Sequence, residues 1–223
     1  DWDKIHIDAN FNAEHIENVR FAGQIKIAAN VRLRNIGLVQ NYEIQDGACI
    51  ENVASVSVEG TTTFGNGTEI NILNEGGGRE LPIYDLLTSQ VAYLLVNYRY
   101  DKSFIAALKE MIHRYVDSKQ SRMGIIGAGV RICNCGTIKN VAIGPHALLE
   151  NACCLAEGTI VSNKHAPVTI GEGVIARHFI VLSGSKMNEG ALLSHCFVGQ
   201  AVSMGKQFSG ENSAFFANCE AFH

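Results

Sequence analysis

The sequence has little proline and few aromatic residues: three prolines and 8% aromatics among 223 residues. No apolar run approaches the roughly 18 residues that would suggest a membrane-spanning helix. The first residues show no signal-peptide pattern, so we expect a cytoplasmic protein with no membrane partner. With a net charge of −4 and a pI near 6.1, the chain also lacks the basic surface that nucleic acid requires. We therefore expect no nucleic-acid partner.

Metal-binding patterns are also missing. Seven cysteines are present, but none forms the C-x-x-C pairs of a structural zinc site, and we interpret them as small apolar filler. The histidines His146, His165, His178 and His195 are separated by 19, 13 and 17 residues, whereas a catalytic zinc site at a subunit interface would need closer spacing. We expect no metal.

A short phrase recurs instead: an asparagine, an aliphatic residue, any residue, then another apolar one. Copies begin at Asn18, Asn30, Asn35, Asn41 and Asn140, with gaps close to multiples of five or six residues. Such a repeat period is too short for a pair of helices and indicates very short strands joined by corners. Asparagine suits these corners because it tolerates the left-handed backbone region and its amide can hydrogen-bond along a stack of turns.

Apolar residues follow the same period. One row contains Ile143, Leu149, Leu155 and Val161, each six positions apart. The pattern predicts a coil in which every sixth side chain points into one interior stack. An ordinary β-sandwich is the alternative, but it would show turn signals roughly every 8 to 12 residues. We therefore predict a mainly β protein, a parallel β-helix.

The repeat is interrupted in the middle of the chain. The composition of residues 74–80 predicts a glycine-rich loop. Residues 104–116 then carry an apolar stripe at helical spacing, and residues 83–100 suggest a preceding helix with Pro82 and Asp85 near its start. We predict one structural domain: a first coil section at 1–73, an inserted helical hairpin at 74–121, and a second coil section at 122–223. The corner-like Asn218-Cys219 so near the end leaves open that the chain is a fragment.

His195 is the sharpest candidate for chemistry. Aligning residues 194–199 with residues 139–144 places this histidine where the repeat otherwise has Asn140. An imidazole there could take a proton from an amine or hydroxyl nucleophile, because its pKa lies near neutrality. Equally, the histidine could replace asparagine in a purely structural role. His165 lies in a stretch where the repeat period is irregular, which predicts a loop that bulges from the coil and carries function.

The hexad rows, with Ile143-Gly144 and Ile170-Gly171, resemble the hexapeptide-repeat superfamily of left-handed parallel β-helices. The left hand is implied by this resemblance alone. The segment from His195 to Ala201 is similar to the catalytic-histidine segment of the bifunctional glucosamine-1-phosphate acetyltransferase and N-acetylglucosamine-1-phosphate uridylyltransferase group. It departs from that pattern by lacking one residue before the aromatic position and by having Gln200 in place of an acid.

Residues 74–80, the hairpin and the asparagine-rich turns look closest to a family of large hexapeptide-repeat proteins with sugar-phosphate nucleotidyltransferase-like labels, although the chain has no nucleotidyltransferase motif. The resemblance implies an acyltransferase that uses acetyl-CoA, an amino sugar, sugar phosphate or sugar nucleotide as acceptor, and a homotrimer. His195 would be the general base. Asn163 and Lys164 look like a substrate-binding loop of the acetyltransferase group, and we add His165 and Arg79 as substrate contacts. The alternative is a non-enzymatic scaffold or oligomerisation module.

Overall fold

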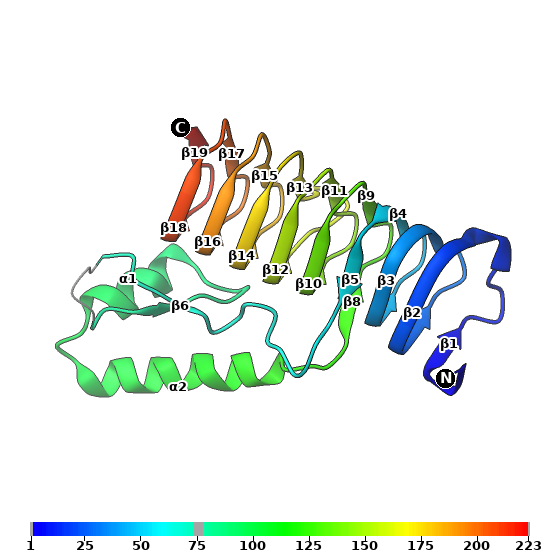
Figure 1. The fold of residues 1–223 in the computed structure, drawn as a ribbon. Coiled ribbons are helices and arrows are strands. Elements are labelled where there is room, and N and C mark those ends of the chain that lie inside the picture. Colours follow the sequence, from blue (N-terminus) through cyan, green and yellow to red (C-terminus); the bar gives the residue numbers. More distant parts are fainter. Residues whose placement is uncertain (1, 74–77, 223) are drawn as a thin grey trace.

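The computed structural model describes residues 2–73 and 78–222. Most of them form parallel strands stacked turn upon turn into a column, with two helices set beside it (Figure 1). Short 3-10 helices cover Trp2–Lys4 and Ala13–His15. The mainly β, parallel architecture with two inserted helices confirms that part of the prediction.

The strands before the insertion are β1 (Ile5–Ile7), β2 (Ile16–Ile27), β3 (Arg32–Ile44), β4 (Cys49–Val53) and β5 (Ser55–Ser57). Those after it are β8 (Gly124–Ile126), β9 (Arg131–Cys133), β10 (Thr137–Ile143), β11 (Leu148–Glu150), β12 (Cys154–Ile160), β13 (Thr169–Ile170), β14 (Ile175–Val181), β15 (Lys186–Met187), β16 (Leu192–Val198), β17 (Ser203–Gly205), β18 (Ser209–Phe215) and β19 (Glu220–Phe222).

One circuit takes 17 residues: Leu33 lies opposite Ile50, and Thr137 lies opposite Cys154. Each circuit has three faces. In the later turns, face 1 contains 137–139, 154–156, 175–177, 192–194 and 209–211. Face 2 contains 141–143, 158–160, 179–181, 196–198 and 213–215, and face 3 contains β11, β13, β15, β17 and β19. The three faces meet at corners where the backbone has positive φ.

The core is the interior of the coil. Ile143, Leu149 and Leu155 are buried there as their period predicted, whereas Val161 is only half-buried. Large rings are accommodated by glycine in the neighbouring turn: a Cβ on Gly158 would lie 2.3 Å from the Phe179 ring. Tyr42 covers Gly124 in the same way, and its hydroxyl donates to the Val141 carbonyl oxygen at 2.8 Å.

The coil is interrupted once and resumes in register. β5 pairs with β10, and Tyr42 of β3 pairs with Gly124, so the chain leaves the coil after Val58 and returns at Gly124. The insertion therefore begins at residue 59, whereas the repeat in the sequence predicted that the coil continues to residue 73. The reason is that Ile70 does not enter the coil interior: it packs with Leu81 in a second apolar cluster.

The insertion contains β6 (Glu69–Ile70) paired antiparallel with β7 (Leu81–Pro82), then α1 (Ser89–Asn97) and α2 (Lys102–Ser118). The apolar stripe of α2 confirms that predicted helix. The predicted start of the first helix was wrong, because Pro82 belongs to β7 and Thr88 caps α1 by accepting from the Val91 N–H. Residues 74–77 of the glycine-rich loop lie outside the described residues.

The insertion runs beside the later turns of the coil (Figure 1). It contacts the outer side of face 2, where Ile180 and Phe197 are buried against insertion residues such as Ile70 and Leu95. The two helices therefore do not pack mainly on each other. They cover one face of the coil.

Candidate functional site

His195 lies at the corner between faces 1 and 2. It belongs to a column of residues at equivalent positions in successive turns, namely Asn140, Glu157, His178, His195 and Asn212, which we call the histidine corner. All five have φ between 48° and 54°. Asparagine, aspartate and histidine adopt this left-handed conformation more readily than other side chains, so histidine can replace asparagine at this position. The sequence alignment of His195 with Asn140 predicted this equivalence. The structure puts both residues at that same corner.

The ring of His195 is held on two sides. It stacks on the ring of His178, with centroids 4.6 Å apart and an interplanar angle of 22°. Its Nδ1 lies 3.0 Å from the Ser194 hydroxyl oxygen. Because these two contacts involve one ring face and Nδ1, they fix the orientation of the imidazole and leave Nε2 for another partner.

The pKa of His195 is lowered from its ordinary value. Partial burial is the largest cause, followed by repulsion from His178, and the negative charge of Glu211 opposes both. A histidine with a lowered pKa is neutral at pH 7 and can accept a proton. His195 can therefore accept a proton at neutral pH, and His178 contributes to lowering its pKa.

Glu157 belongs to the same corner but is occupied differently. Its carboxylate accepts hydrogen bonds from the Asn140 amide and, at 2.9 Å, from the Thr62 hydroxyl of the insertion. Gly65 lies directly against this corner, since a Cβ there would meet the Glu157 carbonyl oxygen at 2.6 Å. Glu157 therefore anchors the start of the insertion.

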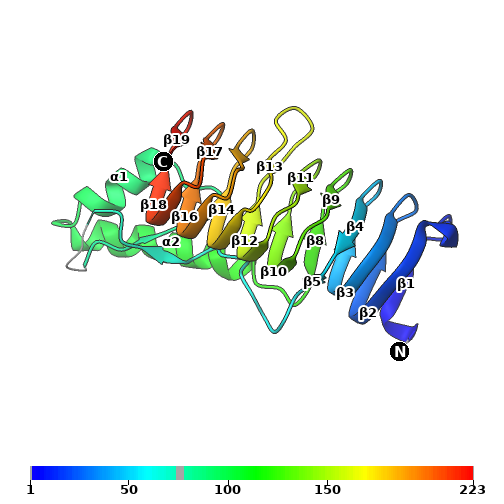
Figure 2. The ribbon, with the colours of Figure 1, turned by 45° about the horizontal axis from the view of Figure 1, so that its top comes forward.

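The structure does not bring the predicted substrate loop to His195. Asn163, Lys164 and His165 lie at the corner between faces 2 and 3, whereas His195 lies at the other edge of face 2. The circuit here is longer, with Cys154 opposite Ile175, and the extra residues form the protruding loop between β12 and β13 (Figure 2). Asn163 stabilises that loop, because its side-chain oxygen accepts from the N–H groups of His165 and Ala166.

Arg79 is exposed in the insertion, outside both corners. The arginine that organises this part of the chain is Arg99, which donates to the carbonyl oxygens of Gly78, Glu80 and Leu95. Sequence reasoning did not single out Arg99, because its partners are main-chain atoms brought near by the fold.

A cavity of about 460 Å³ lies where the insertion meets the coil, and sequence reasoning missed it. At its polar end Asp85 accepts from the Tyr115 hydroxyl at 2.6 Å and from the Lys119 ammonium at 2.9 Å. The Asp85 N–H donates to Asn66, whose amide donates to the Thr159 hydroxyl on face 2. No signal in the sequence links these residues, which come from the insertion and from the coil.

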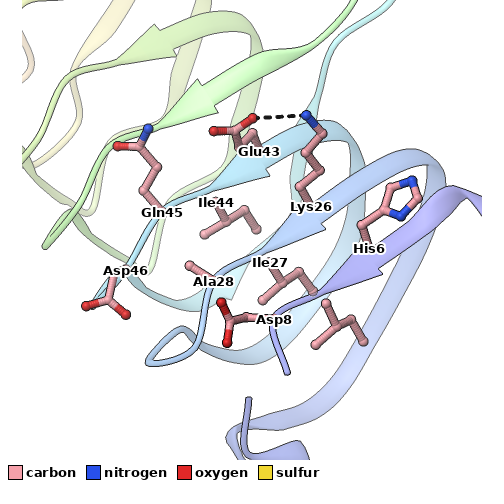
Figure 3. Close-up of a pocket in the computed structure, with 10 residues that line it drawn as sticks. His6, Asp8, Lys26, Ile27, Ala28, Glu43, Ile44, Gln45 and Asp46 are labelled. Carbon is pink, nitrogen blue, oxygen red and sulfur yellow. Dashed lines mark hydrogen bonds and ion pairs between the residues drawn. The ribbon is translucent and has the colours of Figure 1, made fainter. Parts of the chain in front are cut away.

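A second hollow, of about 530 Å³, lies on the early turns. Figure 3 shows His6, Lys26 and Glu43 on three neighbouring strands, with Lys26 paired to Glu43 at 3.4 Å. Asp8 and Asp46 lie along one side of it. This surface is the uncovered early part of face 2, and its charges are exposed to solvent.

Within residues 2–73 and 78–222, no group of three or more His, Cys, Asp or Glu side chains is placed to hold a metal ion. Neither helix in this part of the chain has the length and apolar character needed to cross a membrane.

Comparison with known proteins gives a family but no activity. A family described as "Domain of unknown function (DUF4954)" matches residues 25–223. A relative described as an uncharacterized protein of Treponema pallidum (strain Nichols) is 22% identical over 213 residues. The alignment covers 78% of this chain and 29% of the relative, so the chain spans less than a third of that protein's length. No solved structure matches the chain.

Proposed function

Since the chain belongs to the DUF4954 family, whose description leaves the activity open, we propose a function from the chain's own residues: acyl transfer, with His195 as the general base. The observation that carries this proposal is the state of the His195 ring. It is oriented by Ser194 and His178, and its pKa is lowered, so that it is neutral at pH 7.

In the proposed reaction, Nε2 of His195 removes a proton from the amine of the acceptor as its nitrogen attacks the thioester carbonyl of acetyl-CoA. The Nδ1–H donates to the Ser194 hydroxyl oxygen throughout, which keeps Nε2 as the unprotonated nitrogen. Backbone N–H groups at a glycine corner stabilise the oxyanion, and its collapse expels the CoA thiolate, which takes the proton back from His195. One C–N bond forms and one C–S bond breaks. The charge on the imidazole is transient.

The resemblance of the repeats to hexapeptide-repeat proteins supplies the rest of the proposal. We propose a left-handed coil that assembles as a cytoplasmic homotrimer, with acetyl-CoA lying along the coil between two subunits. The acceptor is an amino sugar, a sugar phosphate or a sugar nucleotide. Because the loop with Asn163, Lys164 and His165 is at a different corner from His195 in one chain, it can reach the acceptor only in the groove between neighbouring subunits.

A non-enzymatic scaffold is the second candidate, and one observation favours it. His178 and His195 both occupy the left-handed conformation that Asn140 and Asn212 adopt at the same corner. Histidine is among the residues that tolerate this conformation, so both rings could be structural. In that case the two stacked imidazoles would replace an amide pair.

Acetyl transfer from acetyl-CoA to a panel of amino sugars, amino-sugar phosphates and nucleotide-linked amino sugars would test the proposal. His195→Asn is the decisive variant, because asparagine preserves the corner conformation but cannot act as a base. We expect its rate to fall about 10²- to 10⁴-fold. His146→Asn is the matched control, since His146 has a φ of 59° at another corner, and it should keep full activity.

Equal rates for the wild type and His195→Asn would remove the base assignment. Absence of turnover with every acceptor, in a protein whose fold is intact by circular dichroism, would favour the scaffold. An equal loss in His146→Asn would mean that the loss in His195→Asn reflects damage to the coil and not lost chemistry.

A further inference from the structure

We propose that the cavity between the insertion and the coil binds a small carboxylic acid with an apolar chain or ring, independently of the chemistry at His195. The cavity lies at the base of the insertion, where residues 59–68 leave the coil and residues 118–123 return to it. Its volume, about 460 Å³, is in the range of small-molecule sites, roughly 300 to 1,000 Å³.

The hollow in the outer side of face 2 comes from small residues. Ala142 lies between Ile125 in the turn before and Thr159 in the turn after. Gly144 follows on the same outer side and cannot be larger, because a Cβ there would lie 2.6 Å from the Ser162 backbone nitrogen. The larger neighbours on both sides therefore become the walls of a depression.

The walls are apolar, whereas the same surface of the two preceding turns is charged. Positions equivalent to Ile125 carry Lys26 and Glu43 in the two preceding turns. Ile125 nevertheless leaves 47% of its surface exposed, and Met123 and Pro145 extend the apolar lining. An exposed isoleucine in a hollow of this kind favours a ligand with an apolar body.

The donor that the polar end offers a ligand is Lys119. Asp85, which is ionised, only accepts, and it does so from Tyr115 and Lys119. The hydroxyl hydrogens of Ser118 and Ser121 are used up, because each donates to a main-chain carbonyl. Lys119 has three N–H donors, of which one reaches Asp85, and its side chain is 36% exposed.

A ligand end that only accepts hydrogen bonds therefore fits best. A carboxylate satisfies this condition and gains from the positive charge of Lys119. The pKa of Lys119 supports the charge: burial lowers it, but the neighbouring Tyr115 and Asp85 raise it by more, so the ammonium is kept. An amine would meet the Lys119 ammonium as a like charge.

Three probes of equal chain length test this assignment: octanoate, octanol and octylamine, each titrated into the whole protein by isothermal calorimetry at pH 7. We expect saturable octanoate binding at least about tenfold tighter than that of either other probe, as a charge-assisted contact should give. Lys119→Gln should lose about this tenfold preference and Lys119→Arg should keep most of it. Ala142→Leu should weaken all three probes by filling the hollow.

Ala156→Leu, on the outer side of face 1, is the control for Ala142→Leu and should bind octanoate normally. His195→Asn should also bind normally, which separates this proposal from the proposed acyl transfer. Thermal unfolding of each variant shows whether the insertion is still packed. The proposal is overturned if octanoate does not saturate, if octanol or octylamine binds as tightly, or if Ala142→Leu leaves octanoate binding unchanged.

Discussion

The early turns of the coil and the turns after the insertion share one interior but differ on the outer side of face 2. In the early turns this side carries Lys26 and Glu43, which are exposed and paired at 3.4 Å. In the later turns the equivalent positions carry Ile180 and Phe197, which are fully buried under the insertion. The type of residue on the outer side therefore depends on whether the insertion covers that position. The interior residues depend on packing inside the coil.

Two corners of the coil also differ. At the corner between faces 3 and 1, Asn18, Asn35 and Asn52 are linked side chain to side chain at 3.1 Å, and Asn52 continues the ladder to Asn134 across the insertion. At the histidine corner, between faces 1 and 2, Asn140 is followed in the later turns by Glu157, His178 and His195. An amide ladder therefore stabilises one corner of the stack, whereas the other corner carries ionisable groups.

The largest expected effect comes from truncating the covered side of face 2. Phe197→Ala should lower the free energy of unfolding by about 3 to 5 kcal/mol, because a fully buried ring is removed. Glu43→Ala, at the equivalent uncovered position, should change it by less than about 0.5 kcal/mol, since an exposed ion pair contributes little. Urea unfolding followed by circular dichroism measures both. Similar losses would mean that the insertion does not stabilise the later turns.

A smaller effect is expected where a glycine accommodates a ring inside the coil. Gly158→Ala should cost about 1 to 3 kcal/mol, because the added methyl would lie 2.3 Å from the Phe179 ring. Phe179→Leu should reduce that cost, so the double variant should be more stable than the two single losses added together. Urea unfolding of the four proteins gives the coupling energy. Simple additivity would contradict a steric clash between these two positions.

The period of the sequence predicted the parts of the structure that repeat. Ile143, Leu149 and Leu155 are buried because each turn places the same position inside, and the pattern is local enough to read without coordinates. His195 was placed at the corner for a related reason: its neighbours align with those of Asn140, and both have a φ of 54°. The role of His195 as a base stays a prediction.

Features that depend on contacts between the coil and the insertion were not predictable. The sequence gives no reason for Lys119 to meet Asp85, or for Ile125 and Thr159 to line the same cavity. The first helix was predicted to begin too early. The apolar residues around Ile83 have helical spacing, but they lie between β7 and α1 and pack in the second apolar cluster. The loop at Asn163 was predicted to bind the substrate. The spacing of the repeat does not indicate whether this loop lies beside His195.

The asparagine ladder allows a finer comparison of the two kinds of corner. Asn35→Ala should cost about 1 to 2 kcal/mol, because alanine disfavours the left-handed conformation and both amide contacts are lost. Asn35→Gly keeps the conformation and should cost less. Thermal unfolding of the two variants separates backbone strain from hydrogen bonding. Equal losses would assign the whole effect to the amide contacts.

The smallest expected effect concerns the pH dependence at the histidine corner. Acyl transfer by a neutral His195 should rise with pH and reach half its maximum below pH 6.5, the ordinary value for histidine, because burial and His178 lower the pKa of His195. His178→Asn removes the like charge and keeps the corner conformation, so the midpoint should move upward, by about one pH unit or less. The measurement is kcat/KM against pH for both proteins. A midpoint that stays in place would show that burial alone lowers the pKa, and a downward move would contradict repulsion between the stacked rings.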